Sequence, residues 1–451
     1  MNDLINYLKK ELKVGVNFDV KFRQEMMNDI HFSLFYISSL VDSELLIRLF
    51  ESIELVTLNG EKVCFSRVLD VKEETDKEII RNSIFQGDIA LIINELKKCF
   101  IIEAKKYPSR SISFPEVEKS VRGSKDSFTE NLIVNVGLIR RRIKSDNLII
   151  KSFYISPESK MFINVIYLDN VCSKQVINSL IKRINDIDVT SLIMSERALE
   201  EALFKQTYHI FPLVRYTERP DVASINLVNG KAIILVDTSS NAIITPITIF
   251  DHFKNVEEYK QNPIVGSFTK TLRFIGSISS VFLVPLFILI TMETSFDNGI
   301  IPFYQLENKN PLLIEVVLVS IILEIIRIAI IHTPNAFITA LSLLCAIVLG
   351  EISISLGLFS SEILLVCSLA IVLNFATPSY ELSLTNRLIS ILFIIVSTIF
   401  GGTGFLLMLI ILFIYLNNIK TLRTPYLYPF MPFDISLFNK VFLRKSSKKK
   451  K

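Results

Sequence analysis

Residues 311–331 read PLLIEVVLVSIILEIIRIAII, and this stretch decides how the rest of the chain is interpreted. It is long enough to cross a bilayer as a helix, because about 20 residues at ~1.5 Å each cover a hydrocarbon layer of ~30 Å. It nevertheless carries Glu315, Glu324 and Arg327. Glu324 would lie roughly 18 Å along the helix, near the middle of that layer. Charges at such a depth usually face a bundle interior or a water-filled path. The stretch therefore predicts a membrane assembly built around a polar path.

The spacing of the charges separates them into two groups. Glu324 and Arg327 are three residues apart, so they share a helix face and can pair. Glu315 lies nine residues before Glu324, about 180° around the helix, and faces elsewhere. Two interpretations stay open: a structural ion pair with an interfacial Glu315, or a polar lining for an ion path. The ion-path candidates are Glu324, Arg327, Glu315 and Glu351, the last near the outer end of the next span.

Further apolar segments surround this span and predict a polytopic helical membrane domain over residues 271–420. They cover residues 274–292, 336–356, 362–380 and 388–416. Lys270 and Arg273 precede the first of them, which places that end of the domain inside the cell.

The last apolar run, residues 388–416, could cross the membrane once or turn back as a hairpin. Gly401, Gly402 and Gly404 interrupt it. A single crossing would put the basic tail outside, whereas a glycine-turned hairpin would return it inside. Because residues 421–451 form a basic tail, the hairpin is favoured. We expect this tail to face the anionic cytoplasmic leaflet rather than nucleic acid.

The N-terminal part of the chain has a soluble composition and predicts two small α/β units, residues 1–110 and 151–270. A basic connector, residues 111–150, would join them. FYI at 35–37 matches IYL at 166–168, and QGD at 86–88 matches NGK at 229–231. These two short matches suggest a duplication without establishing one.

Two charged clusters in this soluble part are candidates for assembly or gating. Arg140, Arg141 and Arg142 end a predicted helix, and they form either a basic surface for an anionic partner or a solvated helix end, where cations suit the macrodipole. The second cluster, within RYTERPD, predicts a hydrogen-bonded joint, with a ligand site as the alternative. The residues proposed for these roles are Arg122, Arg140, Arg141, Arg142, Arg215, Glu218, Arg219 and Asp221.

Several function classes lack a signal in the sequence. The 4 histidines are scattered without metal-ligand spacing, and no glycine-rich phosphate loop or nucleophile elbow occurs. We therefore predict no enzyme activity, no metal and no cofactor. The 5 cysteines include no CxxC pair and are interpreted as free thiols in a reducing compartment. The N-terminus has no continuous apolar core, so we predict no signal peptide and a cytoplasmic N-terminal domain.

Several motifs, taken together, resemble the spore germination receptor A-subunit family, the GerA family, over about residues 30–435. They are PEVE at 115–118, VRG at 121–123, FTE at 128–130, Asn135, LIRRR at 138–142, RYTERPDV at 215–222, residues 350–360, PSYELSLTNR at 378–387 and PYLYPFMPF at 425–433. Ser361 is a departure, because many relatives have Pro there.

This resemblance implies an integral protein of the spore inner membrane with cytoplasmic N-terminal domains. Family members are thought to oligomerise into a channel that releases monovalent cations early in germination, with other membrane subunits as partners. Residues 212–222, 236–246 and 332–334 are most similar to a branch outside the nutrient-receptor operons. That branch implies an auxiliary channel or amplifier. The alternatives are a non-conducting scaffold and a nutrient-receptor A subunit.

Overall fold

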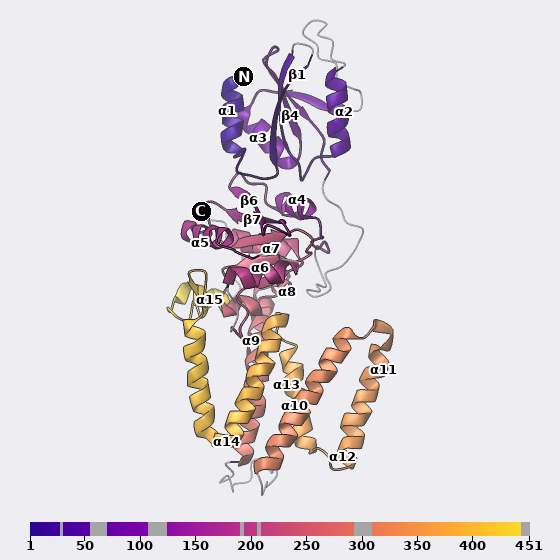
Figure 1. The fold of residues 1–451 in the computed structure, drawn as a ribbon, viewed down its shortest axis with the longest axis vertical. Helices are drawn as coiled ribbons and strands as arrows, with labels where there is room; N and C mark the ends of the chain where they lie inside the picture. Colours follow the sequence, from indigo (N-terminus) through magenta and orange to yellow (C-terminus); the bar gives the residue numbers. More distant parts are fainter. Residues whose placement is uncertain are drawn as a thin grey trace. The chain divides into compact units, whose positions relative to one another are not determined.

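The computed structural model describes residues 1–27, 30–54, 70–106, 124–189, 194–204, 209–292 and 309–442. The chain divides into two compact units (Figure 1). The first, here the sheet unit, comprises Met1–Tyr208, Leu213–Ile247 and Thr421–Thr424. The second, here the helical unit, comprises His209–Pro212, Thr248–Lys420 and Pro425–Lys451.

The sheet unit begins with a five-stranded antiparallel sheet in the order β1-β2-β4-β5-β3. Its strands are β1 (Val20–Met27), β2 (Ile30–Ile37), β3 (Val71–Glu74), β4 (Ile89–Ile93) and β5 (Lys98–Ile102). Helices α1 (Asn2–Glu11) and α3 (Lys77–Gln86) cover one face, and α2 (Ser43–Glu54) packs on the other.

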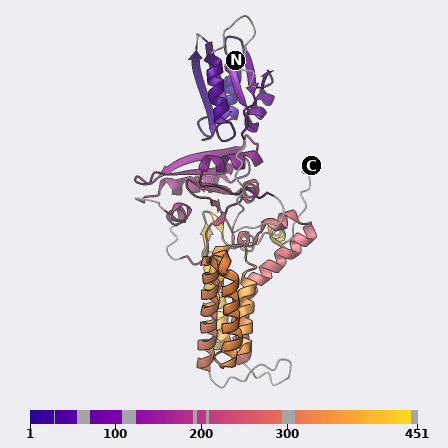
Figure 2. The same cartoon turned by 90° about the vertical axis from the view of Figure 1, so that its right-hand side faces the viewer.

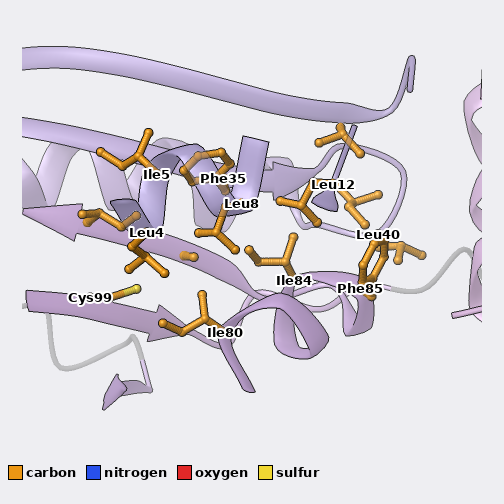
Figure 3. Close-up of a cluster of buried hydrophobic side chains, with 14 residues drawn as sticks. Leu4, Ile5, Leu8, Leu12, Phe35, Leu40, Ile80, Ile84, Phe85 and Cys99 are labelled. Atoms are coloured by element: carbon orange, nitrogen blue, oxygen red, sulfur yellow. The ribbon is translucent and has the colours of Figure 1, made fainter. Parts of the chain in front are cut away.

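Alternating side chains of the strands fill both faces of this sheet. Figure 3 shows Leu8 of α1 and Ile84 of α3 meeting Phe35 of β2 in one apolar cluster. Leu34 points into the opposite cluster, with Leu49 of α2. Because both faces are covered, β4 reads as a continuous apolar run rather than an alternating one.

The second sheet repeats this topology. Its order is β6-β7-β9-β10-β8, again antiparallel throughout. The strands are β6 (Leu148–Ile155), β7 (Met161–Leu168), β8 (Arg215–Thr217), β9 (Ala232–Val236) and β10 (Ala242–Thr245). The helices are α4 (Leu132–Arg142), α5 (Lys174–Asn185), α6 (Ser195–Phe204) and α7 (Pro220–Val228).

The paired motifs of the sequence occupy equivalent places in these two sheets. FYI ends β2 and IYL ends β7, each the second strand of its sheet. QGD directly precedes β4, and NGK directly precedes β9, its equivalent in the second sheet. Helix α4, within the segment interpreted as a connector, packs against α7 and β9 of the second sheet. The prediction of two α/β units is confirmed.

The cysteines of the sheet unit that the structure describes are buried free thiols. Burial raises the pKa of Cys99 to about 12 and that of Cys172 to about 11, because a thiolate loses its hydration in these clusters. Cys64 lies outside the described residues.

The helical unit is built on long apolar helices that run side by side in both views (Figures 1 and 2). They are α9 (Pro263–Met292), α10 (Lys309–His332), α13 (Ser361–Asn374) and α14 (Tyr380–Asn418). Between α10 and α13 lie α11 (Asn335–Ala346), the π-helical η2 (Ile347–Ile352) and α12 (Ser353–Ser355). The shorter elements are η1 (Ile249–Phe253), α8 (Val256–Lys260) and α15 (Ile435–Phe442). A separate two-stranded sheet pairs β11 (Lys420–Thr421) with β12 (Thr424–Pro425). Among the described residues, 3 helices are long and apolar enough to cross a membrane: Pro263–Thr291, Phe337–Ser355 and Tyr380–Asn418.

Helix α14 is a hairpin of two arms. Gly401 has φ 62° and ψ −151°, which are not helical values. The rings of Phe393 and Phe405 lie 5.4 Å apart, and both Thr385 and Tyr415 hydrogen-bond to Ile210. A straight helix would separate Thr385 from Tyr415 by roughly 45 Å. The hairpin favoured by the basic tail is thus present, and its arms, 380–400 and 402–418, are longer than residues 388–416 alone would allow.

Substitution of Gly401 by alanine is expected to destabilise the helical unit by about 1–3 kcal/mol. The backbone at Gly401 is in a region that essentially only glycine adopts, and a Cβ there would meet nothing within 4 Å. The cost is therefore one of conformation rather than collision. Thermal unfolding of the detergent-solubilised protein measures it, with Gly402→Ala as the control. Equal melting temperatures for the two variants would contradict this explanation.

Candidate functional site

The charges of α10 meet α14 in a buried cluster. Arg327 Nε donates to Glu324 Oε1 at 3.1 Å, which is the i, i+3 pair expected from the spacing. Arg387 of α14 donates from its Nε to Glu324 Oε2 at 3.3 Å. Glu324 therefore lies between two arginines. We call Glu324, Arg327 and Arg387 the charge triad.

Further donors of both arginines also find acceptors. Arg327 NH1 donates to Ser383 Oγ on α14 at 3.3 Å. Arg387 NH2 donates to the backbone oxygen of Ser320 on α10 at 3.3 Å. The contacts run in both directions between the helices, so the triad fixes α10 against α14.

A layer of neutral polar side chains continues from the triad toward α9 and α13. Asn374 Nδ2 donates to Ser383 Oγ at 2.9 Å, and Ser280 Oγ donates to Asn374 Oδ1 at 3.4 Å. Ser277 Oγ accepts from Asn386 at 2.8 Å and from Thr377 at 2.7 Å. We call this set the polar layer; its members are Ser277, Ser280, Asn374, Thr377, Ser383 and Asn386, all buried.

The burial of the triad determines how much free energy its charges cost and how much their pairing contributes. The side chains of Glu324, Arg327 and Arg387 are 18%, 7% and 5% exposed. Removing charges from water costs several kcal/mol per ion, and close pairing with further hydrogen bonds offsets that cost. With two arginines and one glutamate the triad carries one excess positive charge. It can hold helices together firmly, but it does not by itself attract a cation.

Glu315 and Glu351, the other ion-path candidates, lie apart from the triad. Glu315 Oε1 accepts from the backbone N and, at 2.6 Å, from the Oγ of Ser360, the N-cap residue of α13. A carboxylate at a helix N-terminus is favoured by the macrodipole. Glu351 is exposed within the π-helical η2. The two glutamates thus mark the other end of α10 and the α11–α12 segment.

Arg387 is the one member of the triad that is not among the candidates named from the sequence. The predicted spans 362–380 and 388–416 leave Arg387 between them, but the helix already begins at Tyr380, with Ser379 accepting from the N of Leu382. This cap moves Arg387 about 10 Å into the helix. The Ser-Tyr-Glu sequence after Pro378 is the signal that could have shown it.

A second buried ion pair lies in the sheet unit. Arg140 of α4 donates from Nε to Asp19 Oδ2 at 2.9 Å and from NH2 to Asp19 Oδ1 at 3.1 Å. Both side chains are 0% exposed. Beside them, Ile150 N donates to Asn17 Oδ1 at 2.9 Å, and Phe18 N donates to the oxygen of Ile150 at 3.1 Å. This set joins the first sheet to β6 of the second, and we call it the sheet joint.

The basic run at the end of α4 is divided among three environments. Arg140 is fully buried in the sheet joint, Arg141 is exposed, and Arg142 pairs with Asp126. The run is therefore not one basic surface. Arg122 lies outside the described residues.

The RYTERPD cluster forms a hydrogen-bonded joint at the start of α7. Arg219 binds Asp221 through Nε at 3.0 Å and NH2 at 2.8 Å, and NH2 also donates to the oxygen of Ser124 at 2.8 Å. The backbone oxygen of Glu218 accepts from Phe128 N at 2.7 Å. Arg215 is buried in β8. These contacts agree with the joint predicted for this cluster.

Comparisons with known proteins identify relatives of this chain. The GerA spore germination protein family of Bacillus and Clostridium matches residues 6–451. The chain is 36% identical over 450 residues to Stage V sporulation protein AF of Bacillus subtilis (strain 168), covering 97% of this chain and 91% of that protein. It is 28% identical over 422 residues to Spore germination protein A1 of the same organism, covering 91% and 86%.

A solved structure also matches the N-terminal part of the chain. It is the N-terminal domain of the A subunit of the Bacillus megaterium spore germinant receptor GerK3, with 22% sequence identity and a TM-score of 0.40. The match covers 55% of this chain and 94% of that one. The family match over nearly the whole sequence, with the paired sheets and the apolar helices, leads to one conclusion: the chain belongs to the GerA family of spore germination proteins.

Proposed function

We propose that this protein forms or gates an ion path in the spore inner membrane and promotes the release of monovalent cations during germination. The observation that carries the proposal is the charge triad, which lies on helices of membrane-spanning length. Charged side chains in such helices are costly and usually serve a path, a relay or a gate. The sheet unit would lie in the cytoplasm, as Lys270 and Arg273 before the first span favour.

The path in this proposal belongs to an oligomer. The triad is packed between α10 and α14 of one chain, and its excess charge is positive. It suits a gate that holds two helices together, while the acidic Glu315 and Glu351 supply the charge that attracts cations. Several copies around a common axis would place these glutamates along one path. Partner germination subunits could complete the ring.

The sheet unit would transmit the gating signal. The sheet joint fastens its two sheets through a buried ion pair, and Arg219 fastens α7 to the segment before α4. Motion of one sheet would then carry the other with it. We assign Arg140, Arg142, Arg215, Glu218, Arg219 and Asp221 to this coupling, with Arg122 and Arg141 as assembly residues.

A scaffold or nutrient-receptor A subunit is the second candidate. The apolar side chains of α11 and α12 favour it, since only 6% of the most apolar part of Phe337–Ser355 is buried within the chain. Such a face suits contact with partner membrane proteins as well as with lipid. This function requires partners and no conduction.

Reconstitution separates the two functions. The purified protein in liposomes that enclose a potassium-sensitive dye is expected to give cation flux, and Glu324→Ala is expected to change that flux at equal protein insertion. Flux from the chain alone excludes a purely non-conducting role. No flux, at an insertion confirmed by protease protection, would favour the scaffold.

A further inference from the structure

The end of the chain carries an apolar surface next to a strongly basic segment. Phe430, Met431, Phe433 and Ile435 are 45%, 40%, 63% and 66% exposed. Soluble proteins rarely gather large apolar side chains on one exposed segment without a partner. Residues 443–451 then add Arg444, Lys445 and Lys448 to Lys451. An apolar surface followed by a basic cluster is typical of a segment that lies on an anionic membrane.

Local contacts give this segment a defined shape. Asp434 caps α15, accepting from the N of Leu437 at 3.2 Å and from Tyr428 Oη at 3.2 Å. The Phe438 ring lies 5.5 Å from that of Phe433 and 6.5 Å from that of Phe430. The exposed aromatics are therefore held on a folded loop and helix rather than on a free strand of chain.

Buried anchors hold the segment against the helical unit. Tyr426 is 0% exposed, and its backbone pairs with Ile419 at 3.0 Å and with Ile249 at 2.9 Å. Ile419 directly follows α14, so the anchor lies at the returning end of the hairpin. Helix α15 also contacts α9.

The first turns of α9 continue the apolar surface. Ile264, Phe268 and Leu272 are 85%, 67% and 57% exposed, although they precede most of the membrane span. Lys270 is buried beneath them, and Arg273 pairs with Glu258 at 2.9 Å. Exposed aromatic and aliphatic side chains at the start of a membrane span suit the boundary between headgroups and acyl chains.

From these observations we propose that residues 426–442 form an interfacial clamp. The apolar side chains around α15 insert at the headgroup boundary of the bilayer that the protein spans, and the basic residues that follow in the sequence add attraction to anionic phospholipid headgroups. Each Lys or Arg near such a surface contributes about 1 kcal/mol, so the tail makes the clamp sensitive to lipid charge and to salt. The clamp would fix the returning arm of α14, and it does not depend on whether the protein conducts ions.

The chain contains 0 tryptophans, which gives a direct test. Phe433→Trp provides a single fluorophore in the full-length protein, reconstituted in phosphatidylcholine vesicles with or without phosphatidylglycerol. Blue-shifted emission and quenching by lipids brominated on the acyl chain are expected, and both are expected to increase with phosphatidylglycerol. Tyr154→Trp, at a 75% exposed site on β6, is the matched control and should report water in all vesicles. Ile435→Trp serves as a second reporter if Phe433→Trp does not fold.

A second variant tests the electrostatic part. Replacing the basic residues of 444–451 with serine is expected to remove the phosphatidylglycerol-dependent increase in quenching. High salt should have the same effect in the parent reporter. Three outcomes would overturn the proposal: no lipid quenching in any vesicle, quenching independent of phosphatidylglycerol, or a blue shift without lipid quenching, which would mean that protein covers the segment.

Discussion

Replacing Glu324 with alanine is expected to destabilise the helical unit by about 3–5 kcal/mol, the usual effect of removing one partner from a buried ion pair. The side chains of Arg327 and Arg387 are only 7% and 5% exposed, and they would stay buried without the carboxylate that they share. The protein should still insert, because the apolar helices remain. In spores, we expect weakened cation release during germination.

Thermal unfolding in detergent and conductivity of the germinating spore suspension measure the two effects. Glu351→Ala is the matched control for stability, because Glu351 is an exposed glutamate of the same unit. The double variant Glu324→Ala/Arg387→Ala should be less destabilised than the sum of the single variants, since the second change removes a stranded charge. Wild-type cation release from spores that carry a correctly assembled Glu324→Ala protein would sink the gating role of the triad.

Replacing Arg140 with alanine is expected to loosen the sheet joint by about 3–5 kcal/mol, again because it leaves a buried partner uncompensated. Asp19 is 0% exposed and would retain only neutral donors such as Ser39, whose Oγ lies 3.2 Å from it. The effect should appear as faster amide hydrogen exchange at Phe18 and Ile150, the two amides that cross the joint.

The neighbouring arginine provides the control for this prediction. Arg141→Ala changes an exposed side chain of the same helix and should leave exchange at those amides unchanged. Asp19→Asn keeps the shape of the side chain and removes its charge. Amide exchange in this variant should therefore be faster than in Arg141→Ala and slower than in Arg140→Ala. Equal rates of amide hydrogen exchange at Ile150 in the Arg140→Ala and Arg141→Ala variants would mean that the sheet joint does not depend on this ion pair.

The fold could be predicted largely because its signals are local. Apolar runs of sufficient length indicated the membrane helices, and short matched motifs indicated two similar α/β units. The hairpin in α14 followed from three glycines and a basic tail. The predicted span 388–416 starts too late, because Ser379 caps a helix that already includes Glu381 and Arg387.

The candidate site was likewise predictable where its contacts are local in the sequence and not where they are distant. The pair of Glu324 and Arg327 was predictable, because both belong to one helix and their spacing fixes their distance. The contribution of Arg387 depends on contact between two helices, 63 residues away from Glu324 along the chain. The burial of Arg140 depends on Asp19, 121 residues away. A run of three arginines at a helix end gives no local sign that one of them is buried.

The reversal at Gly401 also bears on how the protein is made. In the proposed membrane arrangement, the second arm of α14 brings the chain back to the side from which Tyr380 starts, so the residues after Asn418 would not have to be translocated. Those residues include Arg444, Lys445 and Lys448 to Lys451, whose transfer through a lipid layer would be costly. Both arms can instead enter the bilayer as one helical pair once synthesis has passed Asn418, while the ribosome and the cationic end stay on the same side.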